Sequence, residues 1–97
     1  MRIIPEPIVF DWDKGNIDKN FLKHQVSMQE AEEVFGNEPL IIIADIFHSQ
    51  KEQRYQGMGK TNSNRLLFAS FIIRKGQVRV ISIRNMSKKE KNKYEKI

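Results

Sequence analysis

The chain has 97 residues, of which 39% are hydrophobic and 30% charged, and it contains no cysteine. This length predicts one small domain over residues 1–97 and excludes a large multi-part enzyme. The lack of cysteine excludes a disulfide framework, a thiolate metal site and a cysteine nucleophile. The first ten residues lack the pattern of a signal peptide, and no apolar run approaches the roughly 18 residues that a membrane span needs. We therefore expect a cytoplasmic protein that does not enter a membrane.

Positive charge is concentrated in the last quarter of the chain. The formal net charge is +5, but residues 74–97 contribute +7 and residues 1–73 contribute -2. Segregated positive charge attracts phosphate backbones or an acidic protein. A solvated, lysine-rich terminal helix explains the same pattern equally well.

The N-terminal part of the chain begins with an extended segment and a helix. Residues 8–12 are apolar and follow two prolines, which predicts either a first strand or an extended segment leading into the fold. From Asn16 to about His24 the spacing of Ile17, Phe21 and Leu22 predicts a helix with one apolar stripe.

Two further helices are predicted by their start signals. Ser27–Glu30 and Ser87–Glu90 both have the capping-box form, in which the Ser hydroxyl and the Glu carboxylate each satisfy a backbone amide at a helix start. The first of these helices ends near Gly36–Pro39. Its expected buried residues are Met28, Ala31, Val34 and Phe35. The last helix has only Met86, Tyr94 and Ile97 as apolar groups among many lysines, which predicts loose docking.

Between these helices the pattern changes to strands. Apolar runs separated by turns rich in Asn, Ser, Gly and Lys predict strands over residues 40–46, 53–60, 65–73 and 78–84. Short links favour antiparallel pairing, and residues 65–73 are apolar on both faces, which is typical of a central strand. We predict an α+β fold with two N-terminal helices on a four-stranded antiparallel sheet and a basic C-terminal helix.

The chain resembles the BrnT toxins of bacterial type II toxin–antitoxin systems. The resemblance rests on five stretches in the family's order, spanning Phe10 to Glu95: FDWDKGNIDKNFLKHQVS, EAEEVF, HSQKEQRYQGMG, RLLF and VRVISIRNMSKKEKNKYE. It implies a RelE-like fold and a ribonuclease that cleaves RNA and inhibits translation. It also implies a BrnA-like antitoxin whose ribbon-helix-helix domain binds operator DNA, in a heterotetramer of two toxins and two antitoxins. Gln25 stands where the family frequently has Gly.

The chemistry implied needs no metal and no cofactor. RNA cleaves when its 2′-hydroxyl attacks the adjacent phosphorus, so a protein need only remove that proton, protonate the leaving oxygen and neutralise the phosphorane. A carboxylate or imidazole, an acid and fixed cations suffice. The acidic residues of the chain do not form a spaced cluster that predicts a magnesium site.

Glu52 is the first candidate for the general base, because a carboxylate beside Arg54 on a strand edge stays ionised. A simple ion pair with Arg54 or Lys51 is the alternative. Arg65 and Arg84 stand at strand ends, where arginine can bind a phosphate through two nitrogens. We expect Glu52 and Arg54 to lie close to Arg65 and Arg84. The alternative for Arg65 and Arg84 is that they are solvated surface residues.

The two histidines can titrate near neutrality and act as acid or base. His24, beside Lys23 at a helix end, is a catalytic candidate, although the helix dipole alone explains a cation there. For Lys23 we expect a contact with phosphate, and a place on a solvated helix face is the equal alternative. The candidates for RNA binding are His48, Tyr55, Lys88 and Lys89. Stacking on an unpaired base would suit Tyr55 and Trp12, and a core position is the alternative for Trp12.

Two alternatives to an enzyme remain at this stage. One is a nucleic-acid-binding or regulatory module without catalysis, and the other is a structural subunit whose basic helix meets an acidic protein.

Gly57 and Gly59 alternate on one predicted strand. They permit either the close approach of a backbone or nucleotide, or a bulge in the strand.

Overall fold

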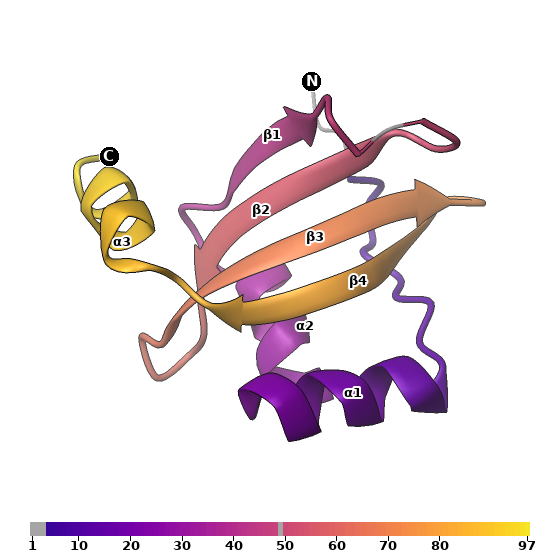
Figure 1. The fold of residues 1–97 in the computed structure, drawn as a ribbon, viewed down its shortest axis with the longest axis horizontal. Helices are drawn as coiled ribbons and strands as arrows, with labels where there is room; N and C mark the ends of the chain where they lie inside the picture. Colours follow the sequence, from indigo (N-terminus) through magenta and orange to yellow (C-terminus); the bar gives the residue numbers. More distant parts are fainter. Residues whose placement is uncertain (1–3, 49) are drawn as a thin grey trace.

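The structure is a computed structural model that describes residues 4–48 and 50–97. In chain order its elements are α1 (Lys14–His24), α2 (Met28–Gly36), β1 (Ile41–Asp45), β2 (Arg54–Lys60), β3 (Leu66–Arg74), β4 (Gln77–Asn85) and α3 (Lys88–Glu95) (Figure 1). The described part of the chain is therefore an α+β fold with three helices and one antiparallel sheet.

The sheet has the strand order β1-β2-β3-β4, and every neighbouring pair is antiparallel. The four predicted strands are confirmed, with small differences at their ends. Before α1, the chain makes one isolated bridge, between Phe10 and Val78 beside β4. Of the two predictions for residues 8–12, the extended segment is therefore the one that the structure adopts.

Helix α2 covers one face of the sheet. Its buried side chains Ala31, Val34 and Phe35 belong to the main hydrophobic core, together with Leu67 and Phe71 of β3. Met28, which we expected to be buried with them, is 41% exposed. Three of the four residues predicted to be buried in α2 are therefore confirmed.

The glycines of β2 allow α2 to approach the sheet. A Cβ atom added at Gly59 would lie 2.9 Å from Val34 Cγ1, which is closer than packed atoms come. The β2–β3 register is continuous through Gly57 and Gly59, so the predicted alternative of a bulge is wrong. The group that approaches the strand closely at Gly59 is helix α2, through Val34.

Helix α1 does not bury the apolar stripe that its sequence predicts. Phe21 is 55% exposed and Leu22 is 81% exposed, whereas Asn20 is buried. The helix is instead attached to β4 through polar groups: the Asn16 amide donates to Val80 O, and the Asn20 side-chain oxygen accepts from Ile83 N at 3.3 Å.

These contacts are explained by an irregularity in β4. Ser82 lies opposite Ser70 while Val80 lies opposite Phe71, so Ile81 has no partner on β3. A bulge leaves backbone groups outside the regular ladder, and buried groups of this kind need partners. The Lys19 ammonium also donates to Ile81 O, at 3.4 Å. The polar side of α1 therefore satisfies the bulged part of β4.

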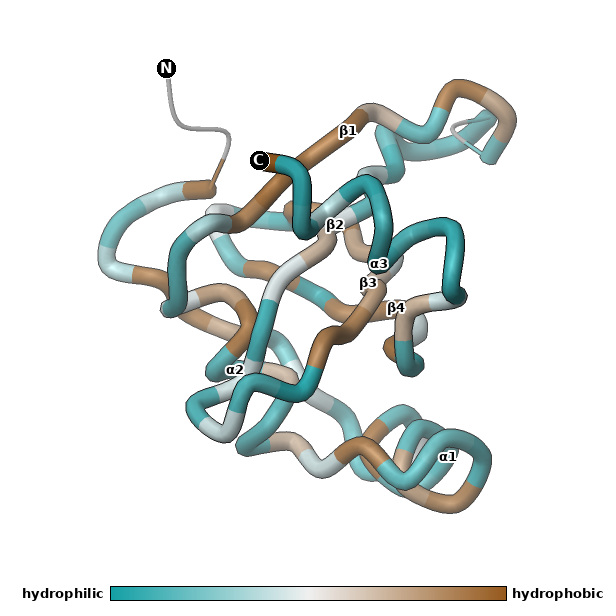
Figure 2. Tube along the Cα trace, turned by 90° about the vertical axis from the view of Figure 1, so that its left-hand side faces the viewer, coloured by the Kyte–Doolittle hydropathy of each residue, from teal (hydrophilic) through white to brown (hydrophobic). Residues whose placement is uncertain are grey.

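The opposite face of the sheet carries α3 at one end. Met86 and Tyr94 pack against Met58, with Phe68 partly buried beside them. Ile97, predicted as an apolar contact of this helix, is 73% exposed. Figure 2 shows hydrophilic colour along most of α3. Its docking thus rests on few apolar groups, together with a hydrogen bond of 2.6 Å from Tyr94 Oη to Pro39 O.

Within residues 4–48 and 50–97, every helix is too short or too polar to cross a bilayer.

Candidate functional site

Arg65, directly before β3, ties the ends of several elements together. Its Nη1 donates to Gln25 O at 2.9 Å and to Glu30 Oε2 at 3.0 Å, and its Nη2 donates to His24 O at 3.2 Å. Its Nε donates to Asn85 Oδ1 at 2.8 Å. The guanidinium that we expected to face a phosphate or solvent is thus largely engaged by the protein, and it fixes the ends of α1, α2 and β4 relative to β3.

Arg84, near the end of β4, is held on two sides. Its Nη1 and Nη2 donate to the two carboxylate oxygens of Glu90 at 2.9 and 3.0 Å. The guanidinium carbon lies 4.4 Å above the ring centre of Phe68. The hydrogen bond with Glu90 raises the pKa of Arg84, and the side chain remains 39% exposed. Arg84 is therefore a fixed cation that solvent and ligands can reach.

His24, the last residue of α1, lies in a cationic field. Partial burial lowers the pKa of its imidazole, and the charges of Lys23, Arg84 and Lys19 lower it further. A lowered pKa leaves the ring neutral at neutral pH, in the form that accepts a proton. In Figure 1 the end of α1, the start of β3 and the end of β4 all lie toward the left of the molecule. We call the residues that gather there the basic cluster: Lys19, Lys23, His24, Arg65 and Arg84.

Glu52 and Arg54 do not belong to the basic cluster. Glu52, just before β2, accepts from Arg74 Nη2 at 2.5 Å, and Arg74 is the last residue of β3. Arg65 precedes the first residue of β3, and at a rise of about 3.3 Å per residue the two ends of this strand are roughly 26 Å apart. The prediction that Glu52 and Arg54 meet Arg65 and Arg84 is therefore wrong.

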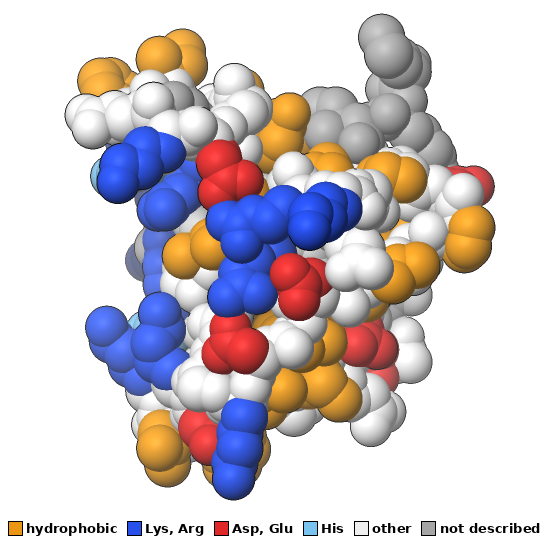
Figure 3. Space-filling view, turned by 90° about the vertical axis from the view of Figure 1, so that its right-hand side faces the viewer, with side chains coloured by type: hydrophobic (Ala, Val, Ile, Leu, Met, Phe, Trp, Pro, Cys, Tyr) orange, Lys and Arg blue, Asp and Glu red, His pale blue; other side chains and the backbone are white. Residues whose placement is uncertain are grey.

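The end of the sheet that carries Glu52 is rich in paired charges. Arg79 of β4 binds Asp11 at 3.2 Å and Asp13 at 2.6 Å, and Arg74 binds Glu52. Figure 3 shows cationic and acidic side chains adjoining one another on this face. Paired charges of this kind neutralise one another. The pKa of Glu52 is lowered by the hydrogen bond from Arg74, so the carboxylate stays ionised.

His48 lies in the turn after β1, also away from the basic cluster. Its Nδ1 is 2.9 Å from Asp45 Oδ2, and the His48 side chain is 65% exposed while Asp45 is 6% exposed. Ser49, which follows His48 in the sequence, lies outside the described residues. The buried carboxylate orients the imidazole and leaves its other nitrogen toward solvent, so His48 can still contact a ligand.

The two aromatic candidates for base stacking are engaged with the protein. Tyr55 stacks on Phe71 with ring centres 5.5 Å apart, and Trp12 stacks on Phe10 at 6.1 Å. Trp12 Nε1 also donates to Glu32 at 2.9 Å. The core alternative for Trp12 is what the structure shows. Tyr55 is half-buried and packs against the same core, and its predicted role in RNA binding stays a prediction.

Lys88 and Lys89 lie in the first turn of α3 and are exposed. Because the same turn contains Glu90, which binds Arg84, these two lysines stand near the basic cluster. Their role in binding a phosphate backbone stays a prediction.

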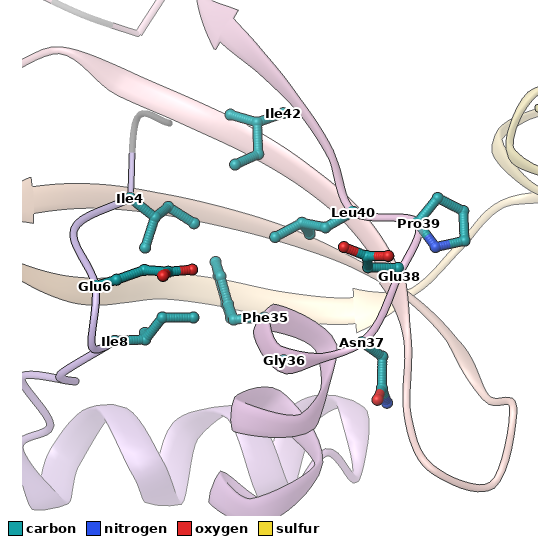
Figure 4. Close-up of a pocket in the computed structure, with 10 residues that line it drawn as sticks. All are labelled: Ile4, Glu6, Ile8, Phe35, Gly36, Asn37, Glu38, Pro39, Leu40 and Ile42. Atoms are coloured by element: carbon teal, nitrogen blue, oxygen red, sulfur yellow. The ribbon is translucent and has the colours of Figure 1, made fainter. Parts of the chain in front are cut away.

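A hollow of the described surface lies elsewhere. It has a volume of about 860 Å³ and lies between the N-terminal segment, the end of α2 and β1, with Ile4, Phe35 and Leu40 among its lining residues (Figure 4). No residue of the basic cluster lines it. Among the described residues no three His, Asp or Glu side chains are grouped to hold a metal ion.

Several residues of this site were not among the candidates chosen from the sequence. They are Lys19, Glu30, Phe68, Asn85 and Glu90. Only the two glutamates had a signal in the sequence, since both occupy the last position of a capping box. The pattern identified their helix-capping role but not the arginine that each one binds.

A neutral imidazole among guanidinium and ammonium groups suits a phosphodiester substrate, which places the chain in the class of small α+β proteins that act on nucleic acid. Residues 12–90 match the family model described as the ribonuclease toxin BrnT of type II toxin–antitoxin systems. Because this match covers most of the chain, the protein belongs to the BrnT toxin family, and the resemblance is confirmed. A toxin of this type has an antitoxin partner. No curated protein sequence matches the chain.

Proposed function

We propose that residues 1–97 form one RelE-like toxin domain that cleaves RNA in the cytoplasm without a metal ion or other cofactor, and so inhibits translation. Membership of the BrnT family supports ribonuclease activity. The observation that carries the mechanism is the position of His24 at the end of α1, where Arg65 Nη2 binds its backbone oxygen at 3.2 Å and the charges of Lys23 and Arg84 help to lower the pKa of its imidazole. A base with fixed cations nearby supplies what attack of the 2′-hydroxyl on the adjacent phosphorus requires.

In the proposed reaction His24 takes the proton of the 2′-hydroxyl. Arg84 and Lys23 balance the negative charge that the pentavalent phosphorus acquires, and Arg65 fixes the backbone of His24 through its 3.2 Å hydrogen bond. The bond between phosphorus and the 5′-oxygen breaks and the leaving oxygen takes a proton from water, which gives a 2′,3′-cyclic phosphate and a free 5′-hydroxyl. Lys88 and Lys89, exposed on α3, bind phosphates beside the cleavage point, and His48 contacts RNA farther along the sheet.

Glu52 was the first candidate for the general base. Because it lies far from the basic cluster, we assign that role to His24 instead. The Glu52 carboxylate is bound to Arg74 at the other end of β3, whereas His24 lies in the field of Arg84. Arg54, the first residue of β2, lies at the Glu52 end of the sheet, so we assign it no contact with the phosphorus being attacked.

The proposed partner is a BrnA-like antitoxin with a ribbon-helix-helix domain. It neutralises the toxin in a heterotetramer, and operator DNA is bound only through the antitoxin. Support for this proposal comes from the type II toxin family, whose members act with an antitoxin. Co-expression with the protein encoded beside this toxin, followed by measurement of the complex mass, tests the partner and the stoichiometry.

The activity is tested with purified protein and a labelled RNA in the presence of EDTA. We expect cleavage with 2′,3′-cyclic phosphate ends, and loss of cleavage in His24→Ala. A matched control is His48→Ala, which removes the other imidazole. It should keep the wild-type kcat and change only the affinity for RNA, because His48 contacts RNA away from the cleavage point. RNA binding without cleavage would instead support a non-catalytic binding module, and that binding should weaken steeply with salt.

A further inference from the structure

The two capping boxes of this chain share a second property. In α2, Glu30 accepts from Ser27 N at 3.2 Å and from Arg65 Nη1 at 3.0 Å. In α3, Glu90 accepts from Ser87 N at 2.8 Å and from both Nη atoms of Arg84. Each glutamate therefore caps a helix and binds an arginine of the sheet with the same carboxylate.

Of the two arginines, Arg84 is the one that its glutamate holds by both terminal nitrogens. Glu90 occupies the Nη1/Nη2 edge of the guanidinium, and Phe68 lies under its plane at 4.4 Å. No described residue accepts a hydrogen bond from Arg84 Nε. A guanidinium has two edges that can bind an oxyanion with two nitrogens, so the Nε edge remains for a phosphate.

We propose that Glu90 is a positioning residue, which fixes Arg84 so that its Nε edge faces the scissile phosphate. Arginine side chains lose considerable conformational entropy when they are immobilised, and Glu90 and Phe68 impose that cost during folding instead of during RNA binding. The inference rests on the proposed ribonuclease function. It makes the first turn of α3 part of the framework of the site.

The attachment of α3 follows from this role. Met86 and Tyr94 pack the helix on Met58, which brings Glu90 to Arg84 at the end of β4. The Ser87 hydroxyl accepts from Glu90 N at 3.2 Å, so the helix start and the arginine contact lie within one turn. A helix with little apolar surface is thereby ordered at the end where its carboxylate is needed.

The test compares Glu90→Gln with Ser87→Ala. Glu90→Gln keeps an oxygen that can cap the helix but loses the charge and one of the two acceptors for Arg84. Ser87→Ala weakens the same helix start and retains the carboxylate. We expect Glu90→Gln to lower kcat for RNA cleavage about tenfold, since a charge-assisted contact is lost, with little change in KM. Ser87→Ala should keep the wild-type kcat.

A double-mutant cycle shows whether Glu90 acts through Arg84. In an Arg84→Ala background, Glu90→Gln should cause no further loss, because contacting residues that act as a unit are not additive. A wild-type kcat in Glu90→Gln would overturn the inference, as would an equal loss in Ser87→Ala or an undiminished loss in the Arg84→Ala background.

A spectroscopic measurement separates this inference from the proposed function. The Nε–H NMR signal of Arg84 should be sharp in the wild-type protein and in Ser87→Ala, and broadened by exchange in Glu90→Gln. If the wild-type protein does not cleave RNA, the proposed function fails, and this signal still decides whether Glu90 fixes the guanidinium. An equally sharp signal in Glu90→Gln refutes the positioning role.

Discussion

Glu52 binds Arg74 at the end of β3, whereas Arg65 lies at the start of the same strand. The separation divides the charged residues of the sheet into two groups. At one end Glu52 and Arg74 neutralise each other, and at the other end Arg84 stands with His24 and Lys23. We therefore expect substitutions in the two groups to have different effects on RNA cleavage.

We expect Arg84→Ala to lower RNA cleavage about 100-fold, which is the typical effect of removing one group that stabilises the transition state, and to abolish growth arrest on induction. Glu52→Gln should retain cleavage and growth arrest, because its carboxylate lies far from the basic cluster. Induced-growth curves and cleavage rates measure both variants. Loss of activity in Glu52→Gln with an unchanged unfolding curve would restore Glu52 as a catalytic candidate.

The cationic field around His24 predicts a pH effect. Burial and then Lys23 lower the pKa of the imidazole below 6.5, because both disfavour its protonated form. Lys23→Gln removes a nearby charge, so the pKa should rise, and the acid limb of the kcat/KM profile should move to higher pH with it.

An NMR titration of the His24 ring measures the pKa directly, and the pH profile of cleavage tests its role. Lys14→Gln, at the other end of α1, is the matched control and should change neither. A cleavage profile that keeps its acid limb while the ring pKa moves would show that another group is the base.

Gln25 ends α1 in a left-handed conformation, with φ of 57°. A side chain in this region costs about 1 kcal/mol or more, which glycine avoids, although glycine loses more backbone entropy on folding. We expect Gln25→Gly to stabilise the protein by up to about 1 kcal/mol.

Urea unfolding at neutral pH measures this change. Asn64, with φ of 67°, provides the control. Asparagine adopts the left-handed region at lower cost, so Asn64→Gly should gain less than Gln25→Gly. The opposite order would mean that the Gln25 side chain contributes contacts that outweigh its backbone conformation.

The close approach of α2 to β2 predicts that substitution to alanine destabilises the protein more at Gly59 than at Gly57. Gly59→Ala places a Cβ 2.9 Å from Val34 Cγ1 and 3.0 Å from Val34 O, so the helix must shift, at a cost of about 1–3 kcal/mol. At Gly57 the nearest atom is Phe71 Cε1 at 3.3 Å, which a small movement of the ring relieves.

Thermal and urea unfolding of Gly59→Ala and Gly57→Ala should therefore give a clearly larger loss for Gly59→Ala. Equal stability of the two variants would show that α2 moves away from the sheet at little cost.

Local patterns in the sequence determined the elements and the class of fold. Capping boxes identified the starts of α2 and α3 because they satisfy backbone amides within four residues, and apolar runs bounded by turn residues identified the strands. The order of short motifs along the chain also indicated the BrnT family. All of these signals are local or linear, and none requires knowledge of which segments meet.

Only the tertiary structure decided which charges meet. Arg65 and Glu30, or Arg84 and His24, are brought together by the packing of α1 and α2 on the sheet, and their spacing in the sequence has no period that would predict it. The exposed Phe21 and Leu22 show the same limit, because a bulge in β4 selects the polar side of α1. Glu52 and Arg54 lie close in sequence to each other, but antiparallel pairing places them at the end of the sheet opposite Arg65, since β2 begins where β3 ends.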